Sequence, residues 1–216
     1  SIGIVNQKRA YEARIKAYQD STGYLKGKLD FDKMKELYEL RFEDVKAMMY
    51  WSETFRRTNE FCTRAMALDR MEVMGPKNKK SKQYILFSDN SDEWDEALDK
   101  EVFAVLLKNY REHVAQKYLP KFYATIDTQF GGDYTKYVDY LYKNSFLMKS
   151  EEKIYVNRKS YLKDPGVQLG LDMLEIRSML RDNIMRTSDS IANMEKFLCA
   201  AKLRMEEDMP HYSDAN

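Results

Sequence analysis

Residues 164–205, DPGVQLGLDMLEIRSMLRDNIMRTSDSIANMEKFLCAAKLRM, contain the pattern that decides the fold. Their apolar positions alternate steps of three and four: Leu169, Met173, Ile176, Leu180, Ile184, Ile191, Met194, Leu198, Ala201 and Met205, with Thr187 filling the one missing place. This spacing over about ten turns predicts one long helix with a single face toward a core. Asp164 suits the N-cap of that helix, and Pro165 suits its first position.

A second long helix is predicted from Phe31 to Glu72, with Asp30 as its cap and the Gly75-Pro76 pair beyond its end. Its apolar stripe shifts near Phe42, so we expect a kink or break there. Shorter helices are predicted at Ile4–Gln19, after the capping-box pattern Asn90–Glu93 as far as Tyr118, at Pro120–Phe130, at Tyr134–Phe146 beyond the Gly131-Gly132 pair, and after Ser150.

The composition agrees with a helical protein. Only 8 glycines and 4 prolines occur in 216 residues, and strong helix formers fill the long stretches between them. Hydrophobic residues make up 44% and charged residues 33%, which suits a globular, water-facing chain. We therefore predict an all-α fold, a helical bundle with two long helices and several shorter ones, in a single helical domain over residues 1–216.

The charge and hydropathy of the chain exclude two classes of partner. The net charge is +1 and the pI is about 7.6, so no nucleic-acid partner is expected. No apolar run approaches the roughly 18 residues of a membrane span. The chain opens Ser1-Ile2-Gly3, without an initiator Met or signal-peptide pattern, which we interpret as the start of a piece cut from a larger protein.

No catalytic, cofactor or metal site is predicted. His113 has no second ligand at the spacing of a zinc-peptidase helix, and His211 follows Pro210 near the end of the chain. Gly-x-Ser-x-Gly and phosphate-loop patterns are also lacking. Cys62 and Cys199 stand among apolar neighbours, which favours two buried thiols over a disulfide and over a zinc site.

Residues 50–61, YWSETFRRTNEF, place polar groups between aromatic ones in the second long helix. One interpretation is a solvated face with the pairs Glu53–Arg57 and Arg56–Glu60. The other is a buried polar network or a set of groups facing a ligand cleft, if Asn59 points inward. Both stay open, and Arg56, Arg57 and Asn59 are the candidate cleft-facing or interdomain residues.

Two further patterns have an ordinary structural explanation beside a functional one. The basic stretch Lys77–Lys82 is interpreted as a solvated loop rather than a nucleic-acid patch, because no aromatic or groove-reading residues accompany it. The tyrosines at 134, 137, 140 and 142 favour packing at the edges of a bundle, with a wall for binding peptide as the alternative.

Several stretches together resemble the helical domain of the bacterial serine dipeptidyl-peptidases grouped as dipeptidyl-peptidases 7 and 11. The resemblance lies in FRRTNEF (55–61), DKEVFAVLLKNYREHVAQKYLPKFY (99–123), GDYTKYVDYLYKNSFL (132–147), DPGVQL (164–169) and YSDAN (212–216). These stretches come in the family's order from about Phe55 onward, whereas the first fifty residues match only loosely. None of them is a catalytic motif.

The resemblance implies a parent enzyme in which a double β-barrel carries a Ser-His-Asp triad and a helical domain is inserted into it. Such an enzyme removes dipeptides from peptide N-termini, and the helical domain lies over the cleft. The triad would lie outside this chain, so no catalytic residue is carried over and the chain alone is expected to be inactive. We also expect an apolar surface on it where the barrel packs.

The predicted function is therefore a substrate-gating helical domain of a serine dipeptidyl-peptidase, excised from a larger protein. Its partners would be the peptide substrate and the catalytic β-barrel of the same polypeptide. The resemblance also implies a periplasmic or secreted enzyme. The alternative is a helical module without enzymatic activity that binds a peptide or a partner helix in an aromatic groove.

Overall fold

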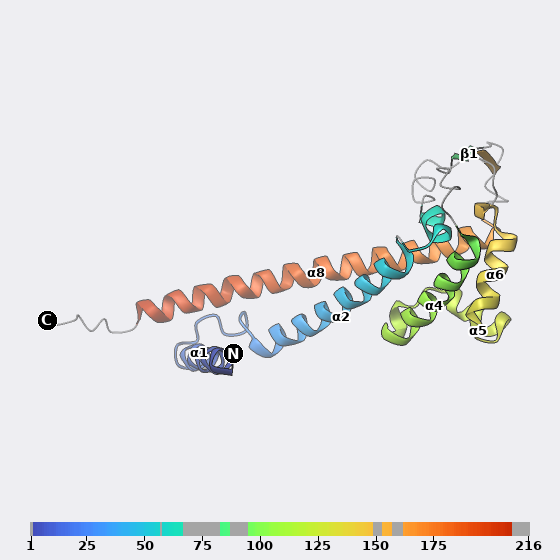
Figure 1. The fold of residues 1–216 in the computed structure, drawn as a ribbon. Coiled ribbons are helices and arrows are strands. Elements are labelled where there is room, and N and C mark those ends of the chain that lie inside the picture. The colour runs from blue at the N-terminus through green and yellow to red at the C-terminus, as the bar shows by residue number, and fades with distance from the viewer. Residues whose placement is uncertain are drawn as a thin grey trace. The chain divides into compact units, whose positions relative to one another are not determined.

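The structure is a computed structural model that describes residues 2–56, 58–66, 83–86, 95–148, 153–156 and 162–208. Its main elements are helices, which confirms the all-α prediction (Figure 1). The helices are α1 (Ile2–Thr22), α2 (Phe31–Phe55), α4 (Glu96–His113), α5 (Phe122–Phe130), α6 (Tyr134–Asn144) and α8 (Pro165–Glu207), with 3₁₀ turns η1 (Gln116–Tyr118) and η2 (Phe146–Met148).

A short sheet of two antiparallel strands accompanies the helices. Strand β1 (Gln83–Leu86) pairs with β2 (Lys153–Val156), with Tyr84 opposite Tyr155. The prediction of a short helix after Ser150 is therefore wrong. In KIYV, two β-branched residues and a tyrosine favour an extended strand once a partner strand is available, and that partner lies far away in the sequence.

The long C-terminal helix is the one that the sequence predicts. Asp164 precedes it, and its Oδ1 accepts hydrogen bonds from the backbone N of Gly166 (2.8 Å) and Val167 (3.2 Å), as expected of an N-cap. Along α8 most of the predicted apolar positions are buried, from Leu169, Met173, Ile176 and Leu180 to Ile191, Ala201 and Met205. Ile184, Met194 and Leu198 are half-buried, so the period marks the inward face of the helix with partial exposure toward its C-terminal half.

The second long helix is shorter than predicted. α2 ends at Phe55, and residues 60–66 form a separate helical segment, so the break falls at residues 56–59 rather than near Phe42. The reason is that Asn59 caps the new segment, since its Oδ1 accepts from the backbone N of Cys62 at 2.7 Å. The remainder of the prediction, to Glu72, lies outside the described residues, as do the basic stretch Lys77–Lys82 and the Asn90–Glu93 capping box.

The fourth helix also differs from the prediction at both ends. It starts after Asp95, whose carboxylate accepts from the backbone N of Ala97 (2.9 Å) and Leu98 (3.1 Å). It ends at His113 rather than Tyr118, because Val114 takes an extended conformation and the chain turns into η1. Between α5 and α6, Gly131 and Gly132 both have positive φ angles of 63° and 80°, which glycine adopts readily and which end α5 as predicted.

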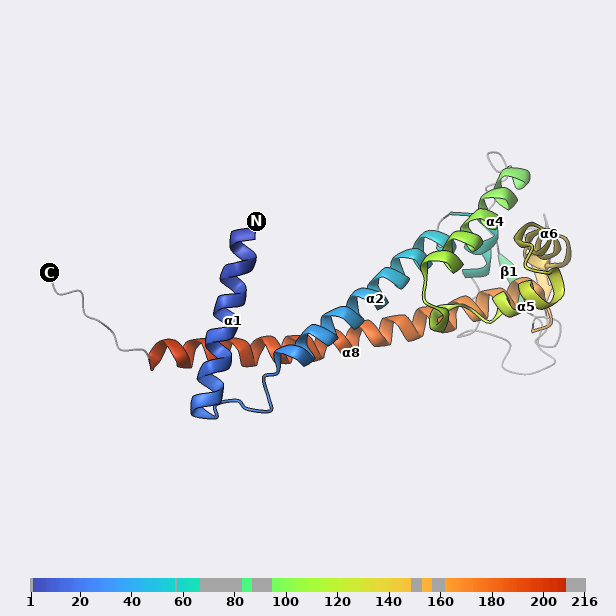
Figure 2. The ribbon, with the colours of Figure 1, turned by 90° about the horizontal axis from the view of Figure 1, so that it is seen from below.

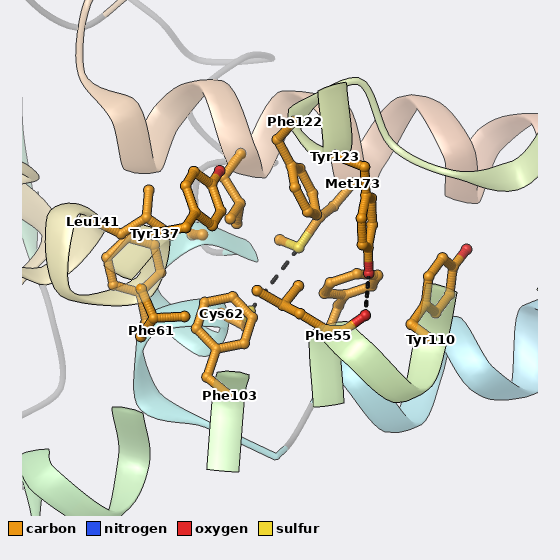
Figure 3. Close-up of a cluster of buried hydrophobic side chains, with 14 of the residues drawn as sticks. Phe55, Phe61, Cys62, Phe103, Tyr110, Phe122, Tyr123, Tyr137, Leu141 and Met173 are labelled. Carbon is orange, nitrogen blue, oxygen red and sulfur yellow. Dashed lines mark hydrogen bonds between the residues drawn. The ribbon is translucent and has the colours of Figure 1, made fainter. Parts of the chain in front are cut away.

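The chain forms two compact units. Unit 1 comprises Ser1–Glu43 and Asn183–Asn216, and unit 2 comprises Asp44–Asp182. Both long helices contribute to each unit. The larger core belongs to unit 2, where α4, α5, α6 and the helical ends of α2 and α8 supply aromatic and aliphatic side chains (Figure 3). The largest of its fully buried side chains are Trp51, Phe55, Phe61, Phe103 and Tyr110.

Unit 1 is built on a smaller cluster of buried side chains. Ile15 of α1 and Leu29 pack with Ala201 and Met205 of α8. Figure 2 shows α1 crossing α8 within this unit. The contact between these helices is reinforced by a hydrogen bond from the hydroxyl of Tyr18 to the carboxylate of Asp208.

Candidate functional site

The polar stretch around Asn59 forms a junction between two helices. Asn59 is only 4% exposed, and both ends of its amide are used. The oxygen caps residues 60–66 at Cys62, while Nδ2 donates toward the carbonyl of Thr54 at the end of α2, at a longer 3.4 Å. The hydroxyl of Thr58 donates to the carbonyl of Glu53. The side chain of Asn59 thus bonds to the end of α2 and to the start of the 60–66 segment.

A carboxylate from another helix holds the same junction. The backbone N of Glu60 donates to both oxygens of Asp99, at 3.0 and 3.1 Å. The hydroxyl of Tyr142 in α6 donates to Asp99 as well. Burial and this carboxylate together raise the pKa of Tyr142, so it stays a neutral donor at neutral pH. Asp99 therefore joins α4, α6 and the 60–66 segment.

Of the two predicted ion pairs, Glu53–Arg57 includes a residue outside the described part of the chain, and Glu60 pairs with Arg64 rather than with Arg56. Glu60 bonds to Arg64 (Nε–Oε1 2.8 Å), and Arg64 also donates to the carbonyl of Leu147 at 2.9 Å. Arg56 is exposed at the break. Arg57 lies outside the described residues. Of the three candidate residues, the structure thus places Arg56 at the surface and Asn59 in the interior, where its polar atoms bond to the backbone.

The buried carboxylates of Asp44 and Asp164 also serve the fold. Asp44 accepts a hydrogen bond from the hydroxyl of Tyr118. Asp164 accepts from the hydroxyl of Ser145 (2.7 Å) and from the backbone N of Phe146 (2.7 Å), in addition to capping α8. Each of these groups is satisfied by donors of the chain itself, so neither is a free base beside a nucleophile.

Asp172 is the carboxylate with the least favourable surroundings. Burial raises its pKa, and the nearby Lys121 opposes that shift. Lys121 itself pairs with Glu175 at 2.5 Å, and both of those side chains are largely exposed. A raised pKa next to a surface ion pair does not by itself define a catalytic site, and no nucleophile bonds to Asp172 among the contacts of the described residues.

The histidine and tyrosine patterns are mainly structural. His113 is exposed at the end of α4, where its ring stacks on Tyr50 with centroids 5.2 Å apart. Tyr137 and Tyr142 are buried, whereas Tyr140 is 39% exposed. Tyr137 stacks on Phe122 with centroids 5.9 Å apart. This agrees with packing at a bundle edge. His211 lies outside the described residues.

The two cysteines are free and differ in environment. Cys62 is buried, with its Sγ 4.0 Å from the Sδ of Met173 (Figure 3). Burial raises the pKa of its thiol. Cys199 is exposed, so the prediction of two buried thiols is right for Cys62 and wrong for Cys199. Cys199 occupies a solvent-facing position of α8, which the apolar character of its sequence neighbours conceals. Within the described part of the chain, His, Cys, Asp and Glu form no cluster that could hold a metal ion.

Unit 1 contains a cavity of about 640 Å³. Its apolar wall is made by Ile4, Tyr11, Ile15, Phe31, Met34 and Leu198. Gln7, Lys8 and Glu12 of α1 complete the lining, so the cavity has one positive and one negative group and an otherwise apolar surface. The sequence carries no signal of this cavity, because its walls come from three helices and the α1 stretch has only a weak apolar period.

Comparison with known proteins shows which family the chain resembles. Residues 2–216 match the model of the family Peptidase S46. The chain belongs to the peptidase S46 family. This confirms the resemblance to bacterial dipeptidyl-peptidases that the sequence stretches indicate, and it extends the match to the first fifty residues.

A relative in the S46 family is dipeptidyl-peptidase 7 of Phocaeicola vulgatus. The two are 26% identical over 178 residues, which cover 76% of this chain and 23% of the relative. The chain thus spans about a quarter of the relative's length. No helix within the described ranges combines the length and the apolar character that a membrane span needs.

Proposed function

We propose that this S46 chain is the substrate-gating helical part of a serine dipeptidyl-peptidase that removes dipeptides from peptide N-termini. The observation that carries the proposal is the family match over residues 2–216, together with a relative that bears the name dipeptidyl-peptidase 7 and is far longer than this chain. The all-helical fold supports it, because the resemblance implies a helical domain beside a double β-barrel.

The chemistry within the described residues supports an accessory role. The buried Asp44 and Asp164 and the half-buried Asp99 bond to hydroxyls and backbone amides that shape the fold. The exposed His113 stacks on Tyr50, and its Nδ1 donates to the carbonyl of Asn109, 2.9 Å away. A nucleophile activated by a base is therefore expected in the remainder of the polypeptide, and the chain alone should not turn over substrate.

In this proposal the helical part covers the cleft and limits substrates to those with a free N-terminus. Arg56, exposed at the helix break, is the described residue that we assign to a cleft or interdomain contact. Arg57 remains a proposed neighbour in the same role. Asn59 would act indirectly, by bonding to the end of α2 and to the start of the 60–66 segment, the two sides of the break at which Arg56 lies. We also propose a periplasmic or secreted location, which the family likeness supports.

The activity is tested with the full-length protein and the 216-residue chain. The full-length protein should release dipeptides from peptides with a free N-terminus and leave N-acetylated peptides intact. Treatment with a serine-directed inhibitor should abolish this dipeptide release. The 216-residue chain should do none of this. Turnover by that chain, or release of single residues by the full-length protein, would contradict the proposal.

Gating is tested by replacing residues 2–208 in the full-length protein with a short Gly/Ser linker. Covalent titration with the serine-directed inhibitor counts the catalytic centres that stay folded, and activity is expressed per titrated centre. Those centres should lose the restriction to free N-termini and cleave N-acetylated peptides. If they titrate fully and still reject N-acetylated peptides, the gating role is wrong.

A further inference from the structure

The side chains that line the cavity of unit 1 leave a large volume unfilled. About 640 Å³ is enough to enclose several side chains, and the walls are mostly apolar. Protein interiors are close-packed, and apolar walls without a partner lose dispersion contacts and expose apolar surface to water. A hollow of this kind therefore gains stability when another group fills it.

The first turns of α1 point to the same conclusion. Every residue from 3 to 10 is exposed, including Ile4 at 61% and Val5 at 48%. Helices in water take most of their stability from packing an apolar face, and about two turns without such a face are marginal. Ile4 also lines the cavity, so an exposed apolar side chain of this stretch belongs to the cavity wall.

The described core of unit 1 is small, so the unit would gain stability from further contacts on this surface. Its buried cluster consists of Ile15, Leu29, Ala201 and Met205, with residues such as Tyr11, Phe31 and Leu198 only partly buried against it. Small units bury a low fraction of their surface and need further stabilisation. Extra apolar contacts on α1 and α2 would supply it.

We propose that side chains of the catalytic part of the same polypeptide fill this cavity and cover the start of α1. This inference rests on the proposed function, since that function supplies the catalytic part. The chain covers 23% of its relative, so a large remainder is available as the partner. A partner on the same chain is present at high effective concentration and fills the cavity permanently, whereas a substrate peptide would leave it empty between turnovers.

The lining favours an uncharged apolar occupant. Lys8 and Glu12 offset each other, so the cavity offers no net charge to recognise a charged peptide end. The remaining wall of aliphatic and aromatic groups fits aliphatic or aromatic side chains of the catalytic part, as in permanent contacts between domains. The contact would anchor the base of α1, at the start of the described chain, to the enzyme.

Photo-cross-linking in the full-length protein tests the contact. The probe p-benzoylphenylalanine replaces Phe31, which lines the cavity, or Phe42, a matched phenylalanine of α2 in the same unit that is 72% exposed. After irradiation, peptide mass spectrometry should find position 31 joined to a peptide outside the 216 residues, within one polypeptide. No cross-link to that peptide should form when the probe is at position 42.

Any other outcome at position 31 overturns the inference. Position 31 joined only to residues of this chain means that the cavity closes on itself. A cross-linked dimer on a denaturing gel means that a second copy fills it, and a cross-link that forms only with added substrate means that peptide does. Dipeptide release by the same preparation is measured in parallel, so an active enzyme without the cross-link refutes this contact alone, and a cross-linked protein without that activity refutes the proposed function.

Discussion

The carboxylate of Asp99, in the first turn of α4, accepts the backbone N–H of Glu60 with both oxygens, at 3.0 and 3.1 Å. The two residues are 39 positions apart, and Glu60 opens the helical segment that follows the break in α2. A side chain from a later helix thus satisfies a donor that a helix start leaves without a partner. The break in α2 is held by tertiary contacts as well as by its own cap.

Replacement of Asp99 by alanine should destabilise the chain. It removes the acceptor of the Glu60 amide and of the Tyr142 hydroxyl, and a lost partner of a buried polar group costs about 1–3 kcal/mol. Urea unfolding followed by fluorescence of the buried Trp51 measures the effect. Glu101→Ala, at an exposed position of the same helix, is the control and should change stability by no more than about 0.5 kcal/mol. Equal midpoints for the two variants would mean that the Asp99 contact contributes nothing.

Substitutions of Asn59 should rank by how much of its cap they keep. Asn59→Ser retains an oxygen that can accept from the Cys62 amide, whereas Asn59→Ala retains none. We expect alanine to cost about 1–2 kcal/mol and serine less, with the remaining loss arising from the missing donor to Thr54. The measurement is the free energy of unfolding. An alanine variant as stable as the wild type would show that the cap does not hold the break.

Gly166 should tolerate no side chain. A Cβ at this position would lie 2.3 Å from the Oγ of Ser145 and 2.7 Å from the Cδ1 of Leu147. Forcing these groups apart costs about 1–3 kcal/mol, and it also disturbs the Ser145–Asp164 hydrogen bond beside the start of α8. Gly166→Ala should therefore lower the thermal midpoint.

The matched change is Gly3→Ala in α1, where nothing lies within 4 Å of the added Cβ. Alanine favours helix over glycine by about 1 kcal/mol, so this variant should be neutral or slightly more stable. Two variants that lose stability equally would show that the close approach at Gly166 has no cost.

Asp172→Asn should stabilise the chain in a pH-dependent way. Burial raises the pKa of Asp172 in the folded state, so the ionised form is disfavoured there relative to the unfolded chain. At neutral pH the variant should have the higher thermal midpoint. Below the ordinary aspartate pKa of about 4 both proteins carry a neutral group, and the difference should vanish.

Asp182→Asn, at an exposed position of the same helix, should show no comparable gain at neutral pH. A loss of stability in Asp172→Asn at neutral pH would show that the attraction to Lys121 outweighs the burial of the carboxylate. Thermal scans at neutral pH and near pH 4 distinguish the two cases.

The two cysteines should react at very different rates. Cys199 is exposed and should be alkylated by a maleimide in the native chain. Cys62 is fully buried and burial raises the pKa of its thiol, so it should react only after unfolding in denaturant. Mass spectrometry counts one adduct in the native state and two in denaturant, and Cys199→Ser should remove the native adduct. Rapid native labelling at residue 62 would contradict its place in the core.

Much of the fold could be predicted because the decisive signals are local. The three-and-four spacing of Leu169 to Met205 defines the buried face of α8, and Asp164 with Pro165 defines its start. The Gly131-Gly132 pair separates α5 from α6 because both residues adopt positive φ angles. Such features depend on a few neighbouring residues and on the geometry of one helix.

The candidate site was predicted less well. Arg56 and Asn59 stand three positions apart in one polar stretch, and the sequence alone left open whether that stretch was a solvated face or a buried network. The structure separates them, with Arg56 exposed and Asn59 buried in a cap. The cavity had no signal in the sequence, because Ile4, Phe31 and Leu198 meet only after three helices pack.

The sequence by itself determined the all-helical class, the length of α8, the lack of a nucleophile motif and the family. These follow from periodicity, from turn residues and from short stretches of likeness, each complete within a segment. Tertiary structure alone decided that α2 ends at Phe55, that residues 153–156 form a strand, and that unit 1 is left with an open cavity. The physical reason is that Asp99, the partner strand 83–86 and the cavity walls come from segments far apart in the chain, and their contacts outweigh local helix preference.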